Sequence, residues 1–457
     1  MEGRLRMYRA SPGAPYVAGI NTEGSMAHAL LWKLGRAPFL IAARKGESMT
    51  HKLILIGLLL TVPLHCGKEV PRYAYSDFST DPLPPGPLNG SLVVCNAGDD
   101  TLSVIDPVHR TVKWRIPIGF IPVELEGPHD IVAAPAGDFI YVTLSESVVG
   151  SGSGPHGAHG TGTIPGYLLK LSTADARVVA FVGLDANPAE IAVSPDGSTV
   201  FVTHFDLIKW GQGVTSGNIR AGDSNLAVVD AATMTIKKRV PICPAAHGVE
   251  ITHDGKTVYA TCSTDEIAVV NVTDPSYPVT RVLVTAGAKE GAGCGYCPYR
   301  LGIAPDDTVW VASLGPASGS QGGGSLRVYD PQTGAFDQAR AVTYCGRSTS
   351  VDFQGSASSF RAFGVEQGLC GNAVRIFDAG GPGRAPASQG GIALPSPTCV
   401  LANDIAFSDD GNTGYVACEG DHTAPGSVMF FDPNSTDVIG SVVAGVFPLE
   451  MGLVPLK

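Results

Sequence analysis

Short apolar runs separated by tight polar turns make up most of this chain. The stretch from Cys243 to Asn271 shows the pattern most clearly. It predicts a strand, an Asp-Gly turn, a second strand, a short polar loop and a third strand. Close copies run over Ile191–Thr203, which reads Ile-Ala-Val-Ser-Pro-Asp-Gly-Ser-Thr-Val-Phe-Val-Thr, and over Ile405–Ala417. The chain therefore repeats one supersecondary unit, which indicates its fold more strongly than its biochemical activity.

The third strand of this unit occurs seven times. The seven copies are Leu102–Asp106, Leu168–Ser172, Leu226–Asp230, Ile267–Asn271, Leu326–Asp330, Val374–Asp378 and Val428–Asp432. Seven such units predict an all-β fold, namely a seven-bladed β-propeller of four-stranded antiparallel blades. The last unit lacks a second strand, and Ser91–Asn96 lacks a first one. We therefore expect this N-terminal strand to be exchanged into the last blade, which closes the ring and leaves no open edge.

The units at Pro188–Asp230 and Ala245–Asn271 resemble the YVTN (YncE-like) β-propeller family. Blades of that family read roughly Pro-x-x-Ile-Ala-Val-Ser-Pro-Asp-Gly, followed by Val-Tyr-Val-Ala-Asn and Val-Ser-Val-Ile-Asp. The resemblance covers about 91–457, and the blades at 349–378 and 428–455 are degenerate. It implies the propeller fold. It implies no single activity, because such propellers serve as scaffolds, lectin-like modules, cofactor-bearing subunits and lactonases.

The composition agrees with many short strands and turns. Charged residues make up 16% of the chain and aromatic residues 7%, whereas Gly (57) and Pro (34) are abundant. The formal net charge of −11 argues against a nucleic-acid partner, because phosphate binding needs a basic face. Ten cysteines without a metal motif favour an oxidising compartment.

The first 90 residues differ from the repeat. Residues 1–48 are Arg-rich and have no strand pattern, and we interpret them as a non-native extension before a true start at Met49. Residues 49–66 combine a basic start, an apolar run and Cys66, as in a signal peptide, and the run is too short to span a membrane. Residues 67–90 are Pro-rich and predict an extended tether.

Residues 49–66 resemble a bacterial lipoprotein signal, in which the Cys is lipidated after cleavage. Leu64 stands one place late and His65 replaces the usual small residue before Cys66, so plain secretion is the alternative. Both interpretations predict an exported protein of the cell envelope, either periplasmic or an outer-membrane lipoprotein. We expect a monomer that contacts the membrane only through a lipid anchor.

Loop lengths distinguish the two faces of the predicted propeller. With the strands of a blade lettered a to d from the axis outwards, the a–b and c–d turns form one face, here the short-turn face. The b–c and d–a loops form the other, the long-loop face. The long connections are 144–166, 204–224, 284–300, 314–325, 379–400 and 418–427. We expect function on the long-loop face, because long loops in a compact fold are usually functional or disordered. The other interpretation is that Gly-rich loops are only slack.

Cysteine spacing predicts disulfides at the ends of strands a and b. Because these strands are antiparallel, cysteines that bracket them meet at one edge of the blade. Two pairs have the same separation and a third has a longer loop. The predicted bonds are Cys243–Cys262, Cys399–Cys418 and Cys345–Cys370.

Cys294-Gly-Tyr-Cys297 is a different motif. A Cys-x-x-Cys is a redox pair, half of a zinc site or a local disulfide. No second Cys-x-x-Cys completes a zinc site, and no His follows Cys297, as c-type haem attachment requires. A local disulfide that stiffens the d–a loop is the leading interpretation. Cys95 is left to pair with one of these two cysteines or to stay free.

The repeat register also predicts a polar ring at the axis. One residue per blade just precedes strand a: Asp130, Glu190, Gly248, Arg300, Ser350, Asp404 and Glu450. One position earlier stand His129, Ala189, His247, Tyr299, Thr349, Asn403 and Leu449. Because the a strands line the central channel, we expect both sets to converge at its mouth on the long-loop face.

Such a funnel suits a cation or a small polar ligand. The predicted ligand contacts are His129, Asp130, Glu190, His247, Arg300, Asn403, Asp404 and Glu450. The predicted metal ligands among them are Asp130, Glu190, Asp404 and Glu450. Their oxygen atoms suit Ca²⁺, and Zn²⁺ competes if His129 and His247 turn inward. The alternative is that these groups satisfy backbone amides at strand starts and hold channel waters.

The sequence has no nucleophile elbow, phosphate-cradling loop, dinucleotide fingerprint or His-Glu-x-x-His motif. We therefore expect a non-enzymatic, exported binding module that presents its long-loop face to a protein or a small polar ligand. The alternatives are a metal-assisted, lactonase-like hydrolase that uses the axial funnel, and a cofactor-bearing or electron-transfer accessory subunit.

Overall fold

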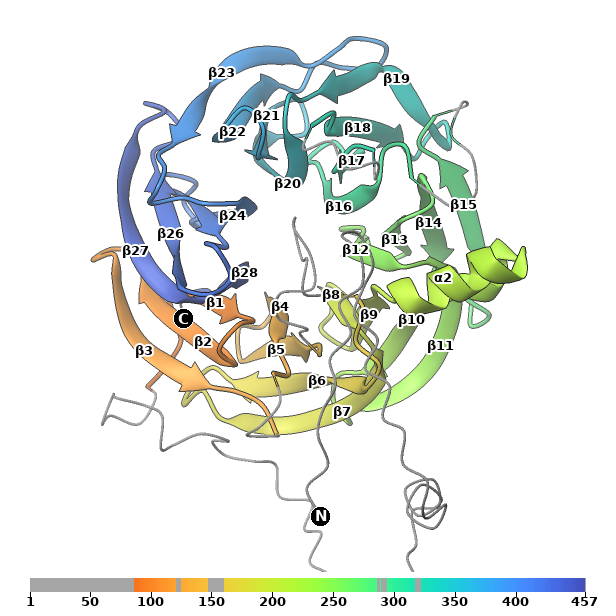
Figure 1. Ribbon diagram of the computed structural model, residues 1–457, viewed down its shortest axis with the longest axis horizontal. Helices are drawn as coiled ribbons and strands as arrows, with labels where there is room; N and C mark the ends of the chain where they lie inside the picture. The colour runs from red at the N-terminus through yellow and green to blue at the C-terminus, as the bar shows by residue number, and fades with distance from the viewer. Residues whose placement is uncertain are drawn as a thin grey trace, which may run out of the picture. The chain divides into compact units, whose positions relative to one another are not determined.

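The computed structural model describes residues 86–120, 125–146, 160–285, 288, 294–316 and 322–456. Within these residues, seven four-stranded antiparallel sheets surround a central axis (Figure 1). The predicted seven-bladed β-propeller is therefore confirmed. The predicted extension, the signal peptide with Cys66 and residues 67–85 of the tether lie outside the described residues.

Six of the blades each use four consecutive strands, of which the first is innermost. Blade 1 contains β4 (Pro128–Ala133), β5 (Phe139–Leu144), β6 (Pro165–Ser172) and β7 (Val178–Ala186). Blade 2 contains β8 (Pro188–Val193), β9 (Thr199–His204), β10 (Asp223–Asp230) and β11 (Thr235–Pro244). Blade 3 contains β12 (Ala246–Ile251), β13 (Thr257–Cys262), β14 (Glu266–Asn271) and β15 (Val279–Leu283). Blade 4 contains β16 (Pro298–Ile303), β17 (Val309–Ser313), β18 (Ser325–Asp330) and β19 (Ala335–Thr343). Blade 5 contains β20 (Arg347–Ser356), β21 (Ser359–Gln367), β22 (Asn372–Asp378) and β23 (Ala387–Leu394). Blade 6 contains β24 (Ala402–Phe407), β25 (Gly414–Cys418), β26 (Pro425–Phe431) and β27 (Val438–Val446).

Blade 7 joins the two ends of the propeller. Its strands in order from the axis are β28 (Pro448–Leu453), β1 (Leu92–Asn96), β2 (Thr101–Asp106) and β3 (Thr111–Pro117). β1 pairs with β28 in antiparallel register, with Val94 opposite Met451. The predicted strand exchange is therefore confirmed. The C-terminal strand supplies strand a, and the N-terminal segment supplies the other three.

Strands in the middle of a blade are apolar on both faces, because each blade is packed between two others. In β13, Val258 and Ala260 join a core cluster with Val228 of blade 2. Tyr259, which points the opposite way, joins a cluster with Val311 of blade 4. This burial on both sides explains why the b and c strands read as nearly continuous apolar runs.

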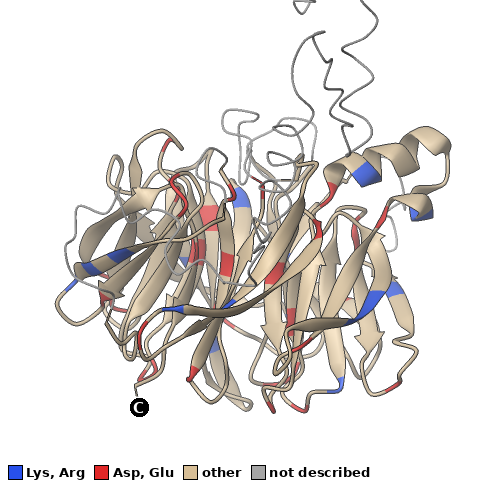
Figure 2. Cartoon of the chain, turned by 90° about the horizontal axis from the view of Figure 1, so that it is seen from below, with Lys and Arg blue, Asp and Glu red and all other residues tan. Residues whose placement is uncertain are grey.

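The b–c connection of blade 2 is partly helical, which the sequence analysis treated only as a long loop. α2 (Leu207–Ser216) is followed by the 3₁₀ helix η1 (Ile219–Gly222). The Asp206 side chain caps α2 by accepting a hydrogen bond from the Lys209 amide at 2.8 Å, and Gly217 ends it in the left-handed conformation at φ 72°. α2 lies on the long-loop face, and the C-terminus lies on the opposite face (Figure 2).

The described chain enters the propeller on the short-turn face. Leu88 is fully buried, and its amide donates to the carbonyl of Thr173, beside the c–d turn of blade 1. Gly90 and Val454 are hydrogen-bonded there as well, with 2.9 Å between the Gly90 nitrogen and the Val454 oxygen. The last residues of the predicted tether are thus packed against the propeller. No helix in the described part of the chain is both long and apolar enough to span a bilayer.

Candidate functional site

The innermost strand of every blade has a register shift at the same place. In β4, Pro128 pairs with Leu144 and Ile131 with Val142, so His129 and Asp130 together lie opposite Thr143. Equivalent shifts occur in the inner strands of the other six blades. The predicted ring residues therefore lie inside the strands at a β-bulge, and the expectation that they precede the strands was wrong. A bulge redirects the side chains beside it, which explains why the ring residues stand at the same position in every repeat.

Arg300 gathers three of the predicted carboxylates around one guanidinium. Its Nε donates to Oε1 of Glu190 at 2.9 Å and its Nη1 donates to Oδ1 of Asp404 at 2.8 Å. Its Nη2 contacts Oε1 of Glu450. These residues come from blades 4, 2, 6 and 7, and all are at most 8% exposed. The predicted convergence at the axis is present, and the cation between these carboxylates belongs to the chain itself.

Three carboxylates of this ring, two of them partners of Arg300, also connect neighbouring blades. Oδ2 of Asp130 accepts a hydrogen bond from the Ile191 amide at 2.6 Å. In the same way, Glu190 accepts from Val249 at 3.2 Å, and Asp404 accepts from Met451 at 3.0 Å. Each amide lies on the inner strand of the next blade. The alternative interpretation from the sequence, that these groups satisfy backbone amides, thus has direct support.

The pKa values follow from this environment. Burial, reinforced by the charge of Glu190, raises the pKa of Asp130 to about 8. Burial alone would also raise the pKa of Glu190, but its hydrogen bond with His247 and the charge of Arg300 hold it below its ordinary value. Glu190 is therefore the more acidic of the two groups and the ionised partner of Arg300, whereas Asp130 holds a proton more readily.

The histidines form an aromatic layer beside the ion pairs. The ring centroids of His129 and His247 lie 5.3 Å apart, and those of His247 and Tyr299 lie 4.2 Å apart. Nδ1 of His247 is 3.1 Å from Oε1 of Glu190. Asn403 is fully buried, and its amide nitrogen donates to the carbonyl of Leu449 at 3.2 Å. These side chains are thus part of the packing between blades.

Among the described residues, no metal centre is evident at the axis. In the part of the chain that the structure describes, no group of three or more His, Cys, Asp or Glu side chains is arranged to hold a metal ion. Binding of Ca²⁺ or Zn²⁺ by the axial carboxylates stays a prediction from the sequence.

The sequence analysis missed two further channel carboxylates, Glu250 and Asp352. Burial raises the pKa of Glu250 to about 8, with smaller contributions from Glu190, Asp130 and Asp352. Burial likewise raises the pKa of Asp352 to about 7. Each lies two residues after a ring position, on β12 and β20. Because alternate residues of a strand face the same side, this spacing was the available signal.

A second feature that the sequence analysis missed is a threonine hydroxyl that forms hydrogen bonds with the backbone of two adjacent blades. Oγ1 of Thr143 accepts from the Asp130 amide at 3.1 Å and donates to the carbonyl of Ala189, in the next blade, at 2.8 Å. Thr203 and Thr261 make the corresponding bonds in blades 2 and 3. The repeated Thr at the end of strand b was the signal. Cys95 occupies this position in blade 7, where it is fully buried and unbonded to another cysteine.

All four predicted disulfides are present, and all lie on the long-loop face. The bonds are Cys243–Cys262, Cys294–Cys297, Cys345–Cys370 and Cys399–Cys418. Cys243–Cys262 joins the end of β11 in blade 2 to the end of β13 in blade 3. Cys399–Cys418 and Cys345–Cys370 each join a d–a connection to the end of strand b or to the b–c loop, and Cys294–Cys297 lies within a d–a loop. The described part of the short-turn face has none.

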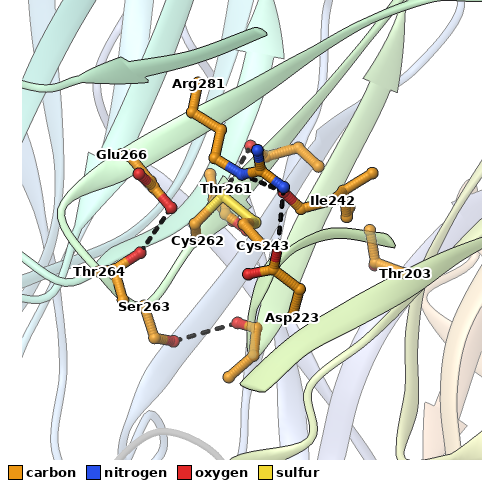
Figure 3. The surroundings of a disulfide bond; sticks show 12 residues. Thr203, Asp223, Ile242, Cys243, Thr261, Cys262, Ser263, Thr264, Glu266 and Arg281 are labelled. Atoms are coloured by element: carbon orange, nitrogen blue, oxygen red, sulfur yellow. Dashed lines mark hydrogen bonds and ion pairs between the residues drawn. A yellow bond between two sulfur atoms is a disulfide. The ribbon is translucent and has the colours of Figure 1, made fainter. Parts of the chain in front are cut away.

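Ion pairs reinforce the long-loop face around the first of these bonds (Figure 3). Arg281 donates to Oδ2 of Asp223 at 2.7 Å and to the carbonyl of Ile242 at 2.6 Å. Arg220, from η1 of blade 2, forms two hydrogen bonds with the carboxylate of Glu266 in blade 3, at 2.8 and 3.0 Å. Blades 2 and 3 are thus fixed to one another at this face.

No protein-family model matches the chain, and no curated protein matches it in sequence. Several solved structures are similar in fold. A functionally unknown protein from Desulfotomaculum acetoxidans has a TM-score of 0.58 at 12% identity, over 81% of this chain and 100% of that one. Hydrazine synthase from Kuenenia stuttgartiensis has a TM-score of 0.54 at 17% identity, over 74% and 92%.

A candidate 6-phosphogluconolactonase from Bacteroides uniformis has a TM-score of 0.53 at 14% identity, over 79% of this chain and 98% of that one. At these identities the likeness shows the β-propeller fold alone. The resemblance to the YVTN family stays a prediction from the repeat.

Proposed function

We propose that the chain is an exported, non-enzymatic binding module that presents its long-loop face to a protein or a small polar ligand. The observation that carries this proposal is the location of all four disulfides on that face. A surface that is already ordered loses less conformational entropy when it binds. The cross-links are thus placed where pre-organisation favours affinity.

The axial cluster supports a non-enzymatic role. Glu190, Asp404 and Glu450 are engaged by Arg300, and Asp130 by backbone amides. A substrate that reached these carboxylates would have to replace bonds between blades. The polar axis is therefore better explained by its contribution to closing the ring.

The N-terminal part of the sequence supports the exported location in this proposal. A lipid on Cys66 would anchor the chain to the membrane through the tether, and plain secretion is the alternative.

Site-specific photo-crosslinking tests the proposal. A photoreactive amino acid replaces Ile208 or Leu369 on the long-loop face, and Val108 or Asp254 on the short-turn face, all of which are exposed. We expect defined adducts from the first pair only, in cells that express the chain in its native envelope. The captured molecule, once purified, should bind the chain directly. Adducts from the short-turn positions alone contradict the proposal.

The alternative, a metal-assisted hydrolase that uses the axis, has a separate test. Metal analysis of the purified chain is followed by a screen of lactones with and without a chelator. Hydrolysis that is lost both with the chelator and in Glu190→Gln would favour the enzyme. We expect no chelator-sensitive hydrolysis.

A further inference from the structure

The Cys294–Cys297 disulfide differs from the other three in span and exposure. Its cysteines are 3 residues apart, whereas the other bonds span 19 or 25 residues. Cys294 and Cys297 are partly exposed, and Gly295 between them is exposed. The Cys243–Cys262 bond, by contrast, is completely buried. A reagent in solution can therefore reach Cys294–Cys297 without opening a blade.

The loop that carries this disulfide is held in place independently of the S–S bond. Asp265, in the b–c loop of blade 3, is 3% exposed, and its Oδ2 accepts a hydrogen bond from the Gly295 amide at 2.6 Å. Its Oδ1 accepts from the amides of Tyr296 and Cys297 at 2.8 and 3.0 Å. The carbonyls of Tyr296 and Cys297 accept further bonds from the backbone that follows β17.

Side-chain packing adds to this anchoring. The guanidinium of Arg327, on β18, lies 4.0 Å from the ring centroid of Tyr296. Because three amides, two carbonyls and one aromatic ring fix the segment, the two sulfur atoms stay close together after reduction. Re-formation of the bond then needs no large loop closure, in contrast to Cys345–Cys370, which joins two separate connections of blade 5.

We propose that Cys294–Cys297 is a reversible redox site that exchanges with a dithiol of a partner protein. A thiolate of the partner attacks one sulfur of the bond, the S–S bond breaks, and the other cysteine leaves as a thiolate that takes a proton from water. The partner's second thiolate then attacks the mixed disulfide and displaces the remaining cysteine, which is protonated in turn. The partner dithiol is oxidised to a disulfide, and Cys294 and Cys297 receive its two electrons.

Asp265 also affects the equilibrium between the Cys294–Cys297 disulfide and its dithiol form. The three amides of the loop point at its carboxylate, so they do not stabilise a thiolate, and its negative charge opposes one. The pair therefore favours the disulfide. The partner that fits is a strongly reducing dithiol.

The first test is a redox titration of the full chain with reduced and oxidised dithiothreitol, followed by alkylation and peptide mapping. We expect Cys294 and Cys297 to be reduced and re-oxidised together while thermal unfolding stays sharp, and Cys243–Cys262 to remain oxidised. Reduction that occurs only with unfolding, or that does not reverse, overturns the proposal.

The second test uses Asp265→Asn. Without the negative charge, we expect the equilibrium constant for reduction of Cys294–Cys297 by dithiothreitol to rise about tenfold at pH 8. At pH 6 the rise should be smaller, because the thiols are protonated in both proteins. Asp421→Asn is the matched control, because Asp421 accepts from two loop amides beside Cys399–Cys418 in the same manner. An equal shift in both variants, or none in Asp265→Asn, overturns the role of Asp265.

The third test traps the exchange with a thioredoxin that lacks its resolving cysteine. We expect a mixed disulfide with Cys294 or Cys297, and none in a variant in which both are replaced by Ser. That variant also controls for folding, since the hydrogen bonds of Asp265 should keep its melting temperature close to that of the parent. An adduct at another cysteine, or no adduct, contradicts the proposal.

Discussion

Arg300 holds three carboxylates at the axis that would otherwise repel one another. Replacing it by Met leaves Glu190, Asp404 and Glu450 buried without a counter-charge, and we expect a loss of roughly 3–5 kcal/mol of unfolding free energy at pH 8. At pH 5 the loss should be smaller, because the carboxylates can take up protons. Denaturant unfolding at the two pH values measures this.

The control for this variant is Arg177→Met, since Arg177 pairs with Asp175 at the surface, with side-chain exposures of 53% and 43%. Its effect should stay within about 0.5 kcal/mol. Equal losses in the two variants would contradict the central position of Arg300.

The channel carboxylates also predict the pH dependence of stability. The pKa of Glu250 is raised to about 8 in the folded chain and is about 4 in an unfolded one. Between these values the folded state binds the extra proton, so stability falls as the pH rises from about 4 to 8. Thermal unfolding at pH 5 and pH 8 should show this fall, and Glu250→Gln should reduce it.

Asp196→Asn is the control for this titration. A hydrogen bond from the Ser194 hydroxyl, with others from Ser198, holds the pKa of Asp196 at about 2. Ionised Asp196 therefore stabilises the folded chain at any pH above the pKa that it has in the unfolded chain, about 4. This stabilisation is lost as the pH falls from about 4 to about 2. The difference between pH 5 and pH 8 should therefore be the same as in the parent. If Glu250→Gln leaves that difference unchanged as well, Glu250 does not titrate in this range.

At the scale of elements, the disulfides cross-link strand ends and connections on the long-loop face. Replacing Cys243 and Cys262 by Ser should cost about 3 kcal/mol, by the entropy of a closed loop of 19 residues. The same change at Cys399 and Cys418 should cost about as much, since its separation is also 19. Differential calorimetry measures both, and non-reducing peptide mapping of the parent checks the pairing. Free thiols or crossed pairs would refute the assignment.

The sequence specified the elements better than their contacts. The Asp-Gly turns and apolar runs placed the strands and the ring positions, because each repeat uses the same register. Which carboxylates meet Arg300 could not be read, since Glu190 and Glu450 lie in other blades and their approach depends on closure. Glu250 was missed although its spacing from Gly248 was visible. α2 was missed because a single helix inside a long loop has no counterpart in the repeat.

At the scale of the whole molecule, the ring depends on the pairing of β1 with β28. Deleting residues 91–97 removes the partner of β28 and leaves β2 with an open edge. We expect a broad, lower thermal transition in place of a cooperative one. Calorimetry of the deletion mutant and the parent measures this. A mutant that melts as sharply and as high as the parent would show that this pairing does not close the ring.

We propose a structural role for the axis and a functional role for the long-loop face, and one measurement separates these roles most directly. It is the photo-crosslink yield from position 369 in the Arg300→Met background, at a temperature where the variant is still folded. We predict an unchanged yield together with a lowered melting temperature. A folded Arg300→Met protein that no longer forms the adduct would place the binding site at the axis and contradict the account.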